Sequence, residues 1–134
     1  MILHISEAAN LGLHALVHLA RTSGGAPVTT ATIAEAYDVS EAHLSKVFQR
    51  LAKAGLVKSV RGPHGGFRLR REPGEITLRE IYEALDGPLL KSTCLFAEAK
   101  CGLNECILGD LLSDVHGRIA ARFTNTTLAD VAAR

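Results

Sequence analysis

The chain has 134 residues, with 15 lysines and arginines against 14 aspartates and glutamates, so its formal net charge is only +1. This length suits one domain, or one domain with an oligomerisation arm. No apolar run approaches the roughly 20 residues that span a bilayer, and the N-terminus lacks the basic start and small-residue cleavage site of a secretory signal. These features exclude a membrane-spanning protein and favour a cytoplasmic location.

The small net charge hides an uneven distribution along the chain. Between Ser40 and Arg71 eight basic residues stand against one acidic residue, a local net charge of +7. The rest of the chain carries seven basic and thirteen acidic residues, or −6. Positive charge concentrated in one segment is typical of a surface that binds nucleic acid.

Two short helices joined by a tight turn are predicted before and within this basic segment. Thr32 and Glu35 have the spacing of a capping box, which predicts that the first helix begins at Thr32. Ser40 is the predicted N-cap of the second helix and Gly55 its end. Such a pair is a helix–turn–helix, whose second helix enters the major groove. Its exposed face carries Ala42, His43, Ser45, Lys46, Gln49 and Arg50. An ordinary solvated helix face is the alternative.

A β-hairpin is predicted directly after these helices. Residues 56–60 and 67–70 alternate as strands, and between them lie Arg61, Gly62, Pro63, His64, Gly65 and Gly66. Glycines allow a tight turn and a close backbone approach, and the flanking arginines suit a phosphate backbone or a minor groove. A nucleotide-binding P-loop needs GxxxxGK followed by a helix, and both are absent. The hairpin is therefore interpreted as the wing of a winged helix–turn–helix.

Helices are also predicted on both sides of this unit. Ser6 is a plausible N-cap for a helix over 6–21, and Thr77 with Glu80 forms a capping box that begins another helix, which ends at residues 86–88. His14 and His18 have metal-ligand spacing on the first helix, but two surface histidines are the preferred interpretation because no acidic residue or cysteine lies nearby in sequence.

A longer amphipathic helix is predicted from Cys106 to Thr124. Its apolar stripe needs a cover, and a second copy of the chain is the simplest one, because palindromic DNA suits a two-fold dimer. Packing against the first helix of the same chain is the rival, and both arrangements are compatible. The stripe consists of Leu108, Leu111, Leu112, Val115, Ile119 and Phe123.

Three cysteines, Cys94, Cys101 and Cys106, are separated by six and four residues. An odd count argues against a disulfide framework, and the spacings fit a zinc knuckle poorly. Thiolates also hold iron–sulfur clusters, and Cys106 at a helix start would favour the thiolate. Acid–base catalysis is not expected, because Glu98 and Glu105 lack a histidine partner.

These residues together resemble the winged-helix regulators of the IscR and NsrR type, the Rrf-two family, over nearly the whole chain. The resemblance is carried by LGLHALVHLA, LSKVFQRLAKAGLVKSVRGPHGGFRL, EITLREIYEALDGPL, the three cysteines and TLADV. It implies a homodimer joined by the long helix, promoter DNA as partner, and an iron–sulfur cluster on the three cysteines. It also implies that Ala42, Ser45 and Lys46 read bases, Ser40 contacts phosphate, and Arg61 is the wing arginine.

Two positions depart from the family pattern. IscR-type members carry a histidine three residues after the last cysteine, where this chain has Gly109. NsrR-type members take an acidic ligand from the first helix of the partner subunit, and the matching position here is Asn10. Glu7 lies one turn earlier, so the expected fourth ligand is Glu7 or Asn10 of the partner subunit. His4, a small thiol or an open iron site are the alternatives.

The expected fold is mostly α with a small β-hairpin: a winged helix–turn–helix domain over 1–88, a cysteine-bearing loop over 89–106, and a dimerisation helix and tail over 107–134. The expected function is dimeric transcriptional regulation in which a two-iron or four-iron cluster tunes promoter binding in response to redox state, nitric oxide or iron–sulfur status. The alternative is a cluster-free regulator whose cysteines form a thiol redox switch, or which responds to a protein partner. No enzyme activity, membrane or small-molecule substrate is expected.

Overall fold

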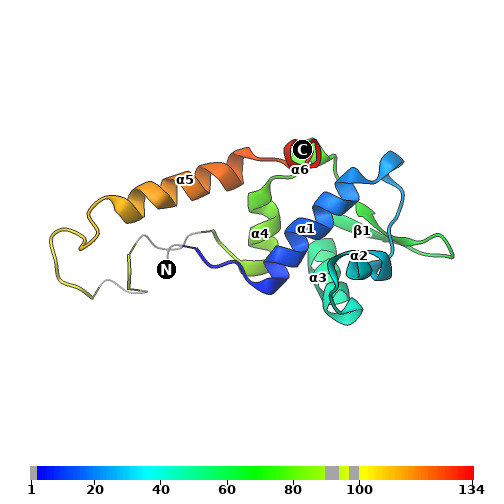
Figure 1. Cartoon of the computed structure of the whole chain (residues 1–134), viewed down its shortest axis with the longest axis horizontal. Coiled ribbons are helices and arrows are strands. Elements are labelled where there is room, and N and C mark those ends of the chain that lie inside the picture. The colour runs from blue at the N-terminus through cyan, green and yellow to red at the C-terminus, as the bar shows by residue number, and fades with distance from the viewer. Residues whose placement is uncertain (1–2, 90–93, 97–99) are drawn as a thin grey trace.

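The computed structural model describes residues 3–89, 94–96 and 100–134. Over these residues the predicted fold class is confirmed, since several helices pack together with one two-stranded hairpin at their edge, and the helix over 111–125 extends away from them (Figure 1). In chain order the elements are α1 (Glu7–Arg21), the 3₁₀ turn η1 (Ser23–Gly25), α2 (Thr30–Tyr37), α3 (Glu41–Lys53), β1 (Val57–Val60), β2 (Gly66–Leu69), the 3₁₀ turn η2 (Pro73–Glu75), α4 (Leu78–Asp86), α5 (Leu111–Asn125) and α6 (Leu128–Ala132).

The core of this body is formed where α1, α3 and α4 meet. At Gly12 the approach of α1 to α4 leaves no room for a side chain, because an added Cβ would collide with Cδ1 of Leu85 and lie 3.7 Å from Cγ1 of Val47. The packing thus fixes both α3 and α4 on α1. The largest fully buried side chains are Phe48, Leu16, Ile33, Leu44, Leu51, Ile76, Ile81, Leu128, Val47 and Val57.

Most of the predicted helix boundaries are confirmed by their capping contacts. The hydroxyl of Ser6 accepts from the Ala9 amide, and that of Ser40 accepts from the His43 amide. Thr77 and Glu80 form the reciprocal capping box that begins α4. Gly55 follows α3 with a φ of +79°, the left-handed conformation that ends a helix.

The predicted start of α2 at Thr32 is wrong. The N-cap is Thr29, whose hydroxyl accepts from the Thr32 amide at 3.1 Å, so Thr32 lies inside the helix. The reason lies in the tertiary structure, where Val28 forms a β-bridge with Phe67 of the wing. That bridge holds the chain extended up to Thr29, and an extended residue directly before the helix takes the cap.

The strands of the wing agree with prediction to within a residue, and β1 pairs antiparallel with β2 from Val57 opposite Leu69 to Val60 opposite Gly66. Val28 extends β2 on its other edge through two backbone hydrogen bonds with Phe67, of 2.9 and 2.8 Å. A side chain at Gly66 would collide with the Val28 carbonyl. The wing is therefore held against the segment that precedes α2.

The long helix begins later than predicted. Residues 107–110 form turns and α5 begins at Leu111, because Gly109 has a left-handed φ of +59° that a helix cannot include. Cys106 consequently lies outside the first helical turn, and the argument that the helix terminus favours its thiolate does not hold.

The apolar stripe of α5 is covered along only part of its length. Leu112 is buried, and the Phe123 ring meets Tyr82 of α4 edge-on with centroids 5.6 Å apart. Leu108 and Leu111, beside Leu112 at the start of the stripe, are exposed. The cover of Phe123 comes from Tyr82 of α4. Packing of the stripe against the first helix, the rival to a second copy, stays a prediction.

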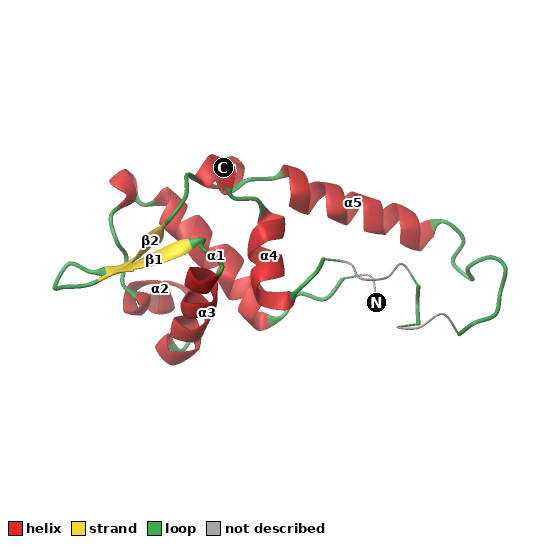
Figure 2. Ribbon diagram, turned by 180° about the vertical axis from the view of Figure 1, so that it is seen from behind, coloured by secondary structure: helices red, strands yellow, loops and turns green. Residues whose placement is uncertain are grey.

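After α5 the chain returns to the body, as Figure 2 shows from behind. The Leu128 amide donates to the Ile76 carbonyl at 2.9 Å, and the Leu78 amide donates to the Thr126 carbonyl at 3.0 Å. Leu128 is fully buried. The C-terminal end of α5 is therefore held to the body through these contacts, and its N-terminal end follows the cysteine loop. None of the helices in the described residues is long and apolar enough to cross a membrane.

Candidate DNA interface and cysteine loop

The recognition helix α3 has one buried face and one exposed face. Leu44, Val47, Phe48 and Leu51 face the core. The predicted DNA-contacting residues Ala42 and Lys46 are exposed, and Ser45 is half-buried. The exposed Ser40 lies directly before the helix, where its hydroxyl caps α3. These four residues occupy the first half of α3 and its cap, which is the part of a recognition helix that reaches base edges.

His43 lies on the same helix but contacts α1. Its Nδ1 is 3.9 Å from Oε1 of Glu7, and the Glu7 side chain is 72% exposed. His43 was predicted to contact DNA and Glu7 to bind iron. In this structure the two side chains lie beside each other within one chain. Asn10, the other proposed fourth ligand, is exposed on α1.

Arg50 in the last turn of α3 has a partner within the chain. Its Nη2 donates a hydrogen bond to the backbone carbonyl of Leu85, near the end of α4. The guanidinium is thus directed at α4, although the residue was predicted to contact DNA.

The tip of the wing exposes Arg61, Gly62 and Pro63, whereas Gly65 and Gly66 are half-buried. Gly62 has a φ of +105°, and a side chain at Gly65 would collide with the Val60 carbonyl. The turn thus leaves no room for a side chain at Gly65 and holds Gly62 in a backbone conformation that favours glycine, so the backbone is accessible at both positions. An accessible backbone turn beside an arginine has the shape and charge for a groove or a phosphate backbone.

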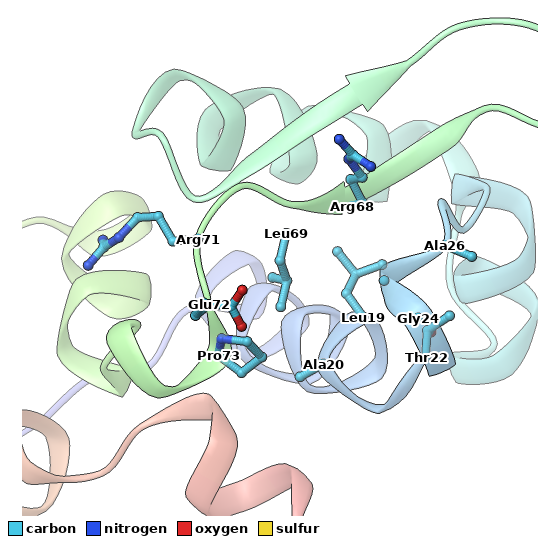
Figure 3. A pocket seen from close by; sticks show the side chains of 11 residues that line it. Leu19, Ala20, Thr22, Gly24, Ala26, Arg68, Leu69, Arg71, Glu72 and Pro73 are labelled. Carbon is cyan, nitrogen blue, oxygen red and sulfur yellow. The ribbon is translucent and has the colours of Figure 1, made fainter.

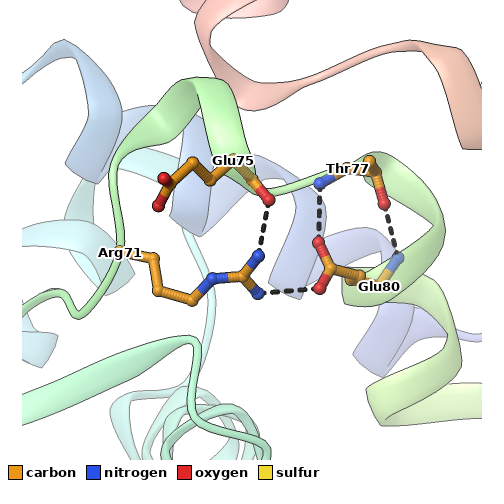
Figure 4. Close-up of polar contacts among 4 residues, drawn as sticks. All are labelled: Arg71, Glu75, Thr77 and Glu80. Atoms are coloured by element: carbon orange, nitrogen blue, oxygen red, sulfur yellow. Dashed lines mark hydrogen bonds and ion pairs between the residues drawn. The ribbon is translucent and has the colours of Figure 1, made fainter.

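The basic segment does not present all of its charges to a ligand. Arg71 donates to Oε1 of Glu80 at 2.7 Å and to the Glu75 carbonyl at 2.6 Å, at the start of α4 (Figure 4). Burial alone would raise the pKa of Glu80, but hydrogen bonds from Arg71 and from the Thr77 backbone, with the charge of Arg71, outweigh it and hold that pKa below its ordinary value. Arg71 therefore supports the capping box.

A cavity of about 350 Å³ lies between the end of α1 and the chain that follows β2, and Arg68 and Arg71 are among its lining residues. Figure 3 shows that these two arginine side chains point in different directions, while Leu69 points toward Leu19 and Ala20. Because the two guanidinium groups do not converge, they form no anion-binding pair there.

The described segments 94–96 and 100–110, which carry the three cysteines, lie at the opposite end of the molecule from the wing (Figure 1). Cys94, Cys101 and Cys106 line one cavity of about 220 Å³, whose other lining residues are Leu95, Phe96 and Ile107. Among the described residues no three histidine, cysteine, aspartate or glutamate side chains are close enough to hold a metal ion. The thiols thus share one cavity without converging on one point. Residues 90–93 and 97–99 of this loop, including Glu98, lie outside the described residues.

The donor set of this cavity fits an iron–sulfur cluster in its chemistry. Three thiols are soft ligands of the kind that hold such clusters. Closure of the loop would have to bring the three sulfurs together.

Comparison with known proteins identifies the family. The sequence profile of the Rrf2 family, described as an iron-dependent transcriptional regulator, matches residues 5–134. The chain belongs to the Rrf2 family. It is 30% identical to the HTH-type transcriptional regulator IscR of Cronobacter sakazakii over 129 residues. The matched region covers 96% of this chain and 80% of that protein.

Two solved structures of regulators named CymR are similar to this Rrf2 chain over nearly their full length. CymR (YrzC), the global cysteine regulator of B. subtilis, gives a TM-score of 0.84 at 33% identity and covers 98% of this chain and 97% of that one. The oxidised form of Staphylococcus aureus CymR gives a TM-score of 0.72 at 30% sequence identity, and the match covers 97% of this chain and 96% of that one. The predicted family and fold are thereby confirmed, and the chain is a regulator of transcription whose family binds DNA.

Sequence reasoning missed the contacts that connect the parts of this Rrf2 chain. The Phe67 ring stacks on Phe48 with centroids 4.5 Å apart, which ties the wing to the recognition helix. The aromatic residues were visible in the sequence, but their pairing depends on the fold. Arg50 was noticed, but its distance of 35 residues from Leu85 gave no signal of their contact.

Proposed function

We propose that the chain is a homodimeric transcriptional regulator that binds double-stranded promoter DNA through α3 and the wing, with an affinity set by an iron–sulfur cluster on Cys94, Cys101 and Cys106. The observation that carries the cluster is the single cavity lined by all three thiols. When bound, a cluster of two or four irons supplies a centre that reacts with oxidants or nitric oxide. Glu7 or Asn10 of the partner subunit remains the proposed fourth ligand.

The DNA-binding half of the proposal rests on the exposed faces described above. Lys46 and Ala42 on α3, and Arg61 at the wing, are exposed on one rigid unit. The proposed contact residues are Ser40 before α3, Ala42, His43, Ser45 and Lys46 on it, and Arg61, Gly62, Pro63, Gly65 and Gly66 of the wing. Arg50, which was also predicted to contact DNA, is left out of this set because its guanidinium bonds the Leu85 carbonyl. A dimer would present two such units to a palindromic site.

The dimer is supported by the uncovered end of α5. Ile107 is 76% exposed, Leu111 52% and Leu108 40%. These three large apolar side chains, at and just before the start of α5, favour an intermolecular partner. The proposed fourth ligand requires that, in such a dimer, the first helix of each subunit reaches the other subunit's cysteines. The division into a DNA-binding domain (1–88), a cysteine loop (89–106) and a dimerisation part (107–134) is retained as part of the proposal.

The test is anaerobic purification of the full chain, with measurement of its visible absorption and of iron and sulfide per chain. Replacement of Cys106 by serine is the informative variant, and Ser113→Ala on the exposed side of α5 is the matched control. We expect a coloured protein whose iron content falls in Cys106→Ser and is unchanged in Ser113→Ala. A colourless, iron-free protein after reconstitution would end the cluster proposal.

The second candidate is a cluster-free regulator that uses its cysteines as a thiol switch or responds to a protein partner. Its support is the similarity to the oxidised form of Staphylococcus aureus CymR over 96% of that chain. In this case the protein is colourless, Cys101 and Cys106 react readily with alkylating agents, and oxidation alone changes DNA affinity. Cys101 and Cys106 are both exposed, as that reaction requires.

A further inference from the structure

The end of α4 is held by three neighbours. The Arg50 guanidinium of α3 donates to the Leu85 carbonyl. Ser6, at the start of α1, donates from its amide to Oδ2 of Asp86 at 2.9 Å and from its hydroxyl to Oδ1. The Leu85 side chain is buried beneath Gly12 of α1. α1 and α3 therefore both contact the last two residues of α4.

The Arg50 contact has a clear local reason. The last carbonyls of a helix lack partners within the helix and carry the negative end of its dipole. Gly87 turns the chain away with a φ of +80°, and its amide bonds the Glu83 carbonyl at 3.2 Å. The Leu85 carbonyl is left for a side chain, and a guanidinium satisfies it with a charge-assisted bond.

The position of this contact matters for control. Leu89, four residues after Leu85, is buried and is the last described residue before Cys94. Along the chain, the end of α4 is therefore the part of the described fold that directly precedes the cysteine loop. Asp86 holds that end to α1, whereas Arg50 holds it to the recognition helix.

We propose that Arg50 is a positioning residue that transmits the state of the cysteine loop to the recognition helix, and not primarily a DNA ligand. This inference rests on the proposed function, in which the loop controls DNA binding. It follows that coupling is reciprocal: DNA binding shifts the equilibrium between the two states of the loop by the same factor that the loop state changes DNA affinity.

The test compares Arg50→Met with Lys53→Met in the full chain. Both substitutions remove one positive charge from the last turn of α3, where Lys53 is exposed. The probe is a duplex selected from a random library by the wild-type protein. Two quantities are measured: the ratio of duplex affinities with the thiols free and alkylated, and the salt dependence of binding.

In the wild type and in Lys53→Met we expect the affinity ratio to differ from one by about fivefold or more, the low end of ordinary coupling. In Arg50→Met we expect a ratio near one with a salt slope equal to that of the wild type. Arg50→Lys keeps a cationic donor and is expected to restore part of the ratio, which separates positioning from misfolding.

Two results overturn the inference in different ways. If Arg50→Met keeps the wild-type ratio and its salt slope flattens by about one, Arg50 is a phosphate contact. If the wild type itself has a ratio of one, the proposed control by the cysteines fails, and the inference fails with it.

Discussion

The ring of Phe67 in the wing stacks on the ring of Phe48 in the recognition helix, with centroids 4.5 Å apart and planes inclined by 10°. Phe48 is fully buried and Phe67 half-buried, so the stack forms the junction between core and wing. The stack ties the wing to α3, which fixes the distance between the two surfaces proposed to contact DNA.

Phe67→Ala is expected to lower the free energy of unfolding by about 3 kcal/mol, because it removes a packed aromatic ring and leaves a cavity. Phe67→Leu keeps most of the volume and is expected to lower it by about 1 kcal/mol. Denaturant unfolding measures both. Equal stability of the alanine variant and the wild type would show that the stack does not anchor the wing.

Alanine substitutions at two wing glycines are expected to separate the stability cost of backbone strain from that of a steric collision. At Gly62 a side chain meets open space but must adopt a φ of +105°, whereas at Gly66 it also collides with the Val28 carbonyl. Gly62→Ala is expected to cost about 1 kcal/mol of stability and Gly66→Ala clearly more. Thermal unfolding provides the comparison. If Gly62→Ala lost more stability than Gly66→Ala, the Val28 bridge would not be the contact that holds the wing.

Much of the DNA-binding half could be predicted from the sequence because its signals are local. Ser40 and Gly55 bound α3 through contacts within a few residues, and the alternating strands with Gly-rich turn specify the hairpin. The start of α2 could not be predicted, because two threonines compete and the distant Phe67 decides between them. The late start of α5 depends on the conformation of Gly109, which composition does not reveal.

The salt dependence of duplex binding is expected to identify the phosphate contacts. Lys46→Ala and Arg61→Ala should each flatten the slope of log affinity against log salt by about one. Arg79 is the control, because it is paired with Glu83 on α4. Unchanged slopes for Lys46→Ala and Arg61→Ala would remove these residues from the interface.

Stability is expected to depend on pH through Glu80. Its pKa is held below the ordinary value of 4.5, so the carboxylate stabilises the fold above that value, and the contribution is lost as pH falls through the lowered pKa. Glu80→Gln should therefore be less stable than the wild type at neutral pH, and the gap should close in acid. Denaturant unfolding at neutral pH and at about pH 3 measures the gap. A gap that persists in acid would rule out the charged pair with Arg71 as its source.

The central proposal is that the three cysteines at one end of the molecule control the affinity with which α3 and the wing, at the opposite end, bind DNA. The most direct measurement is the affinity of anaerobically prepared protein for its selected duplex, before and after removal of iron by a chelator. The account predicts a change of about fivefold or more between the two states, with loss of this change in Cys106→Ser. Identical affinities in an iron-containing and an iron-free preparation would contradict it.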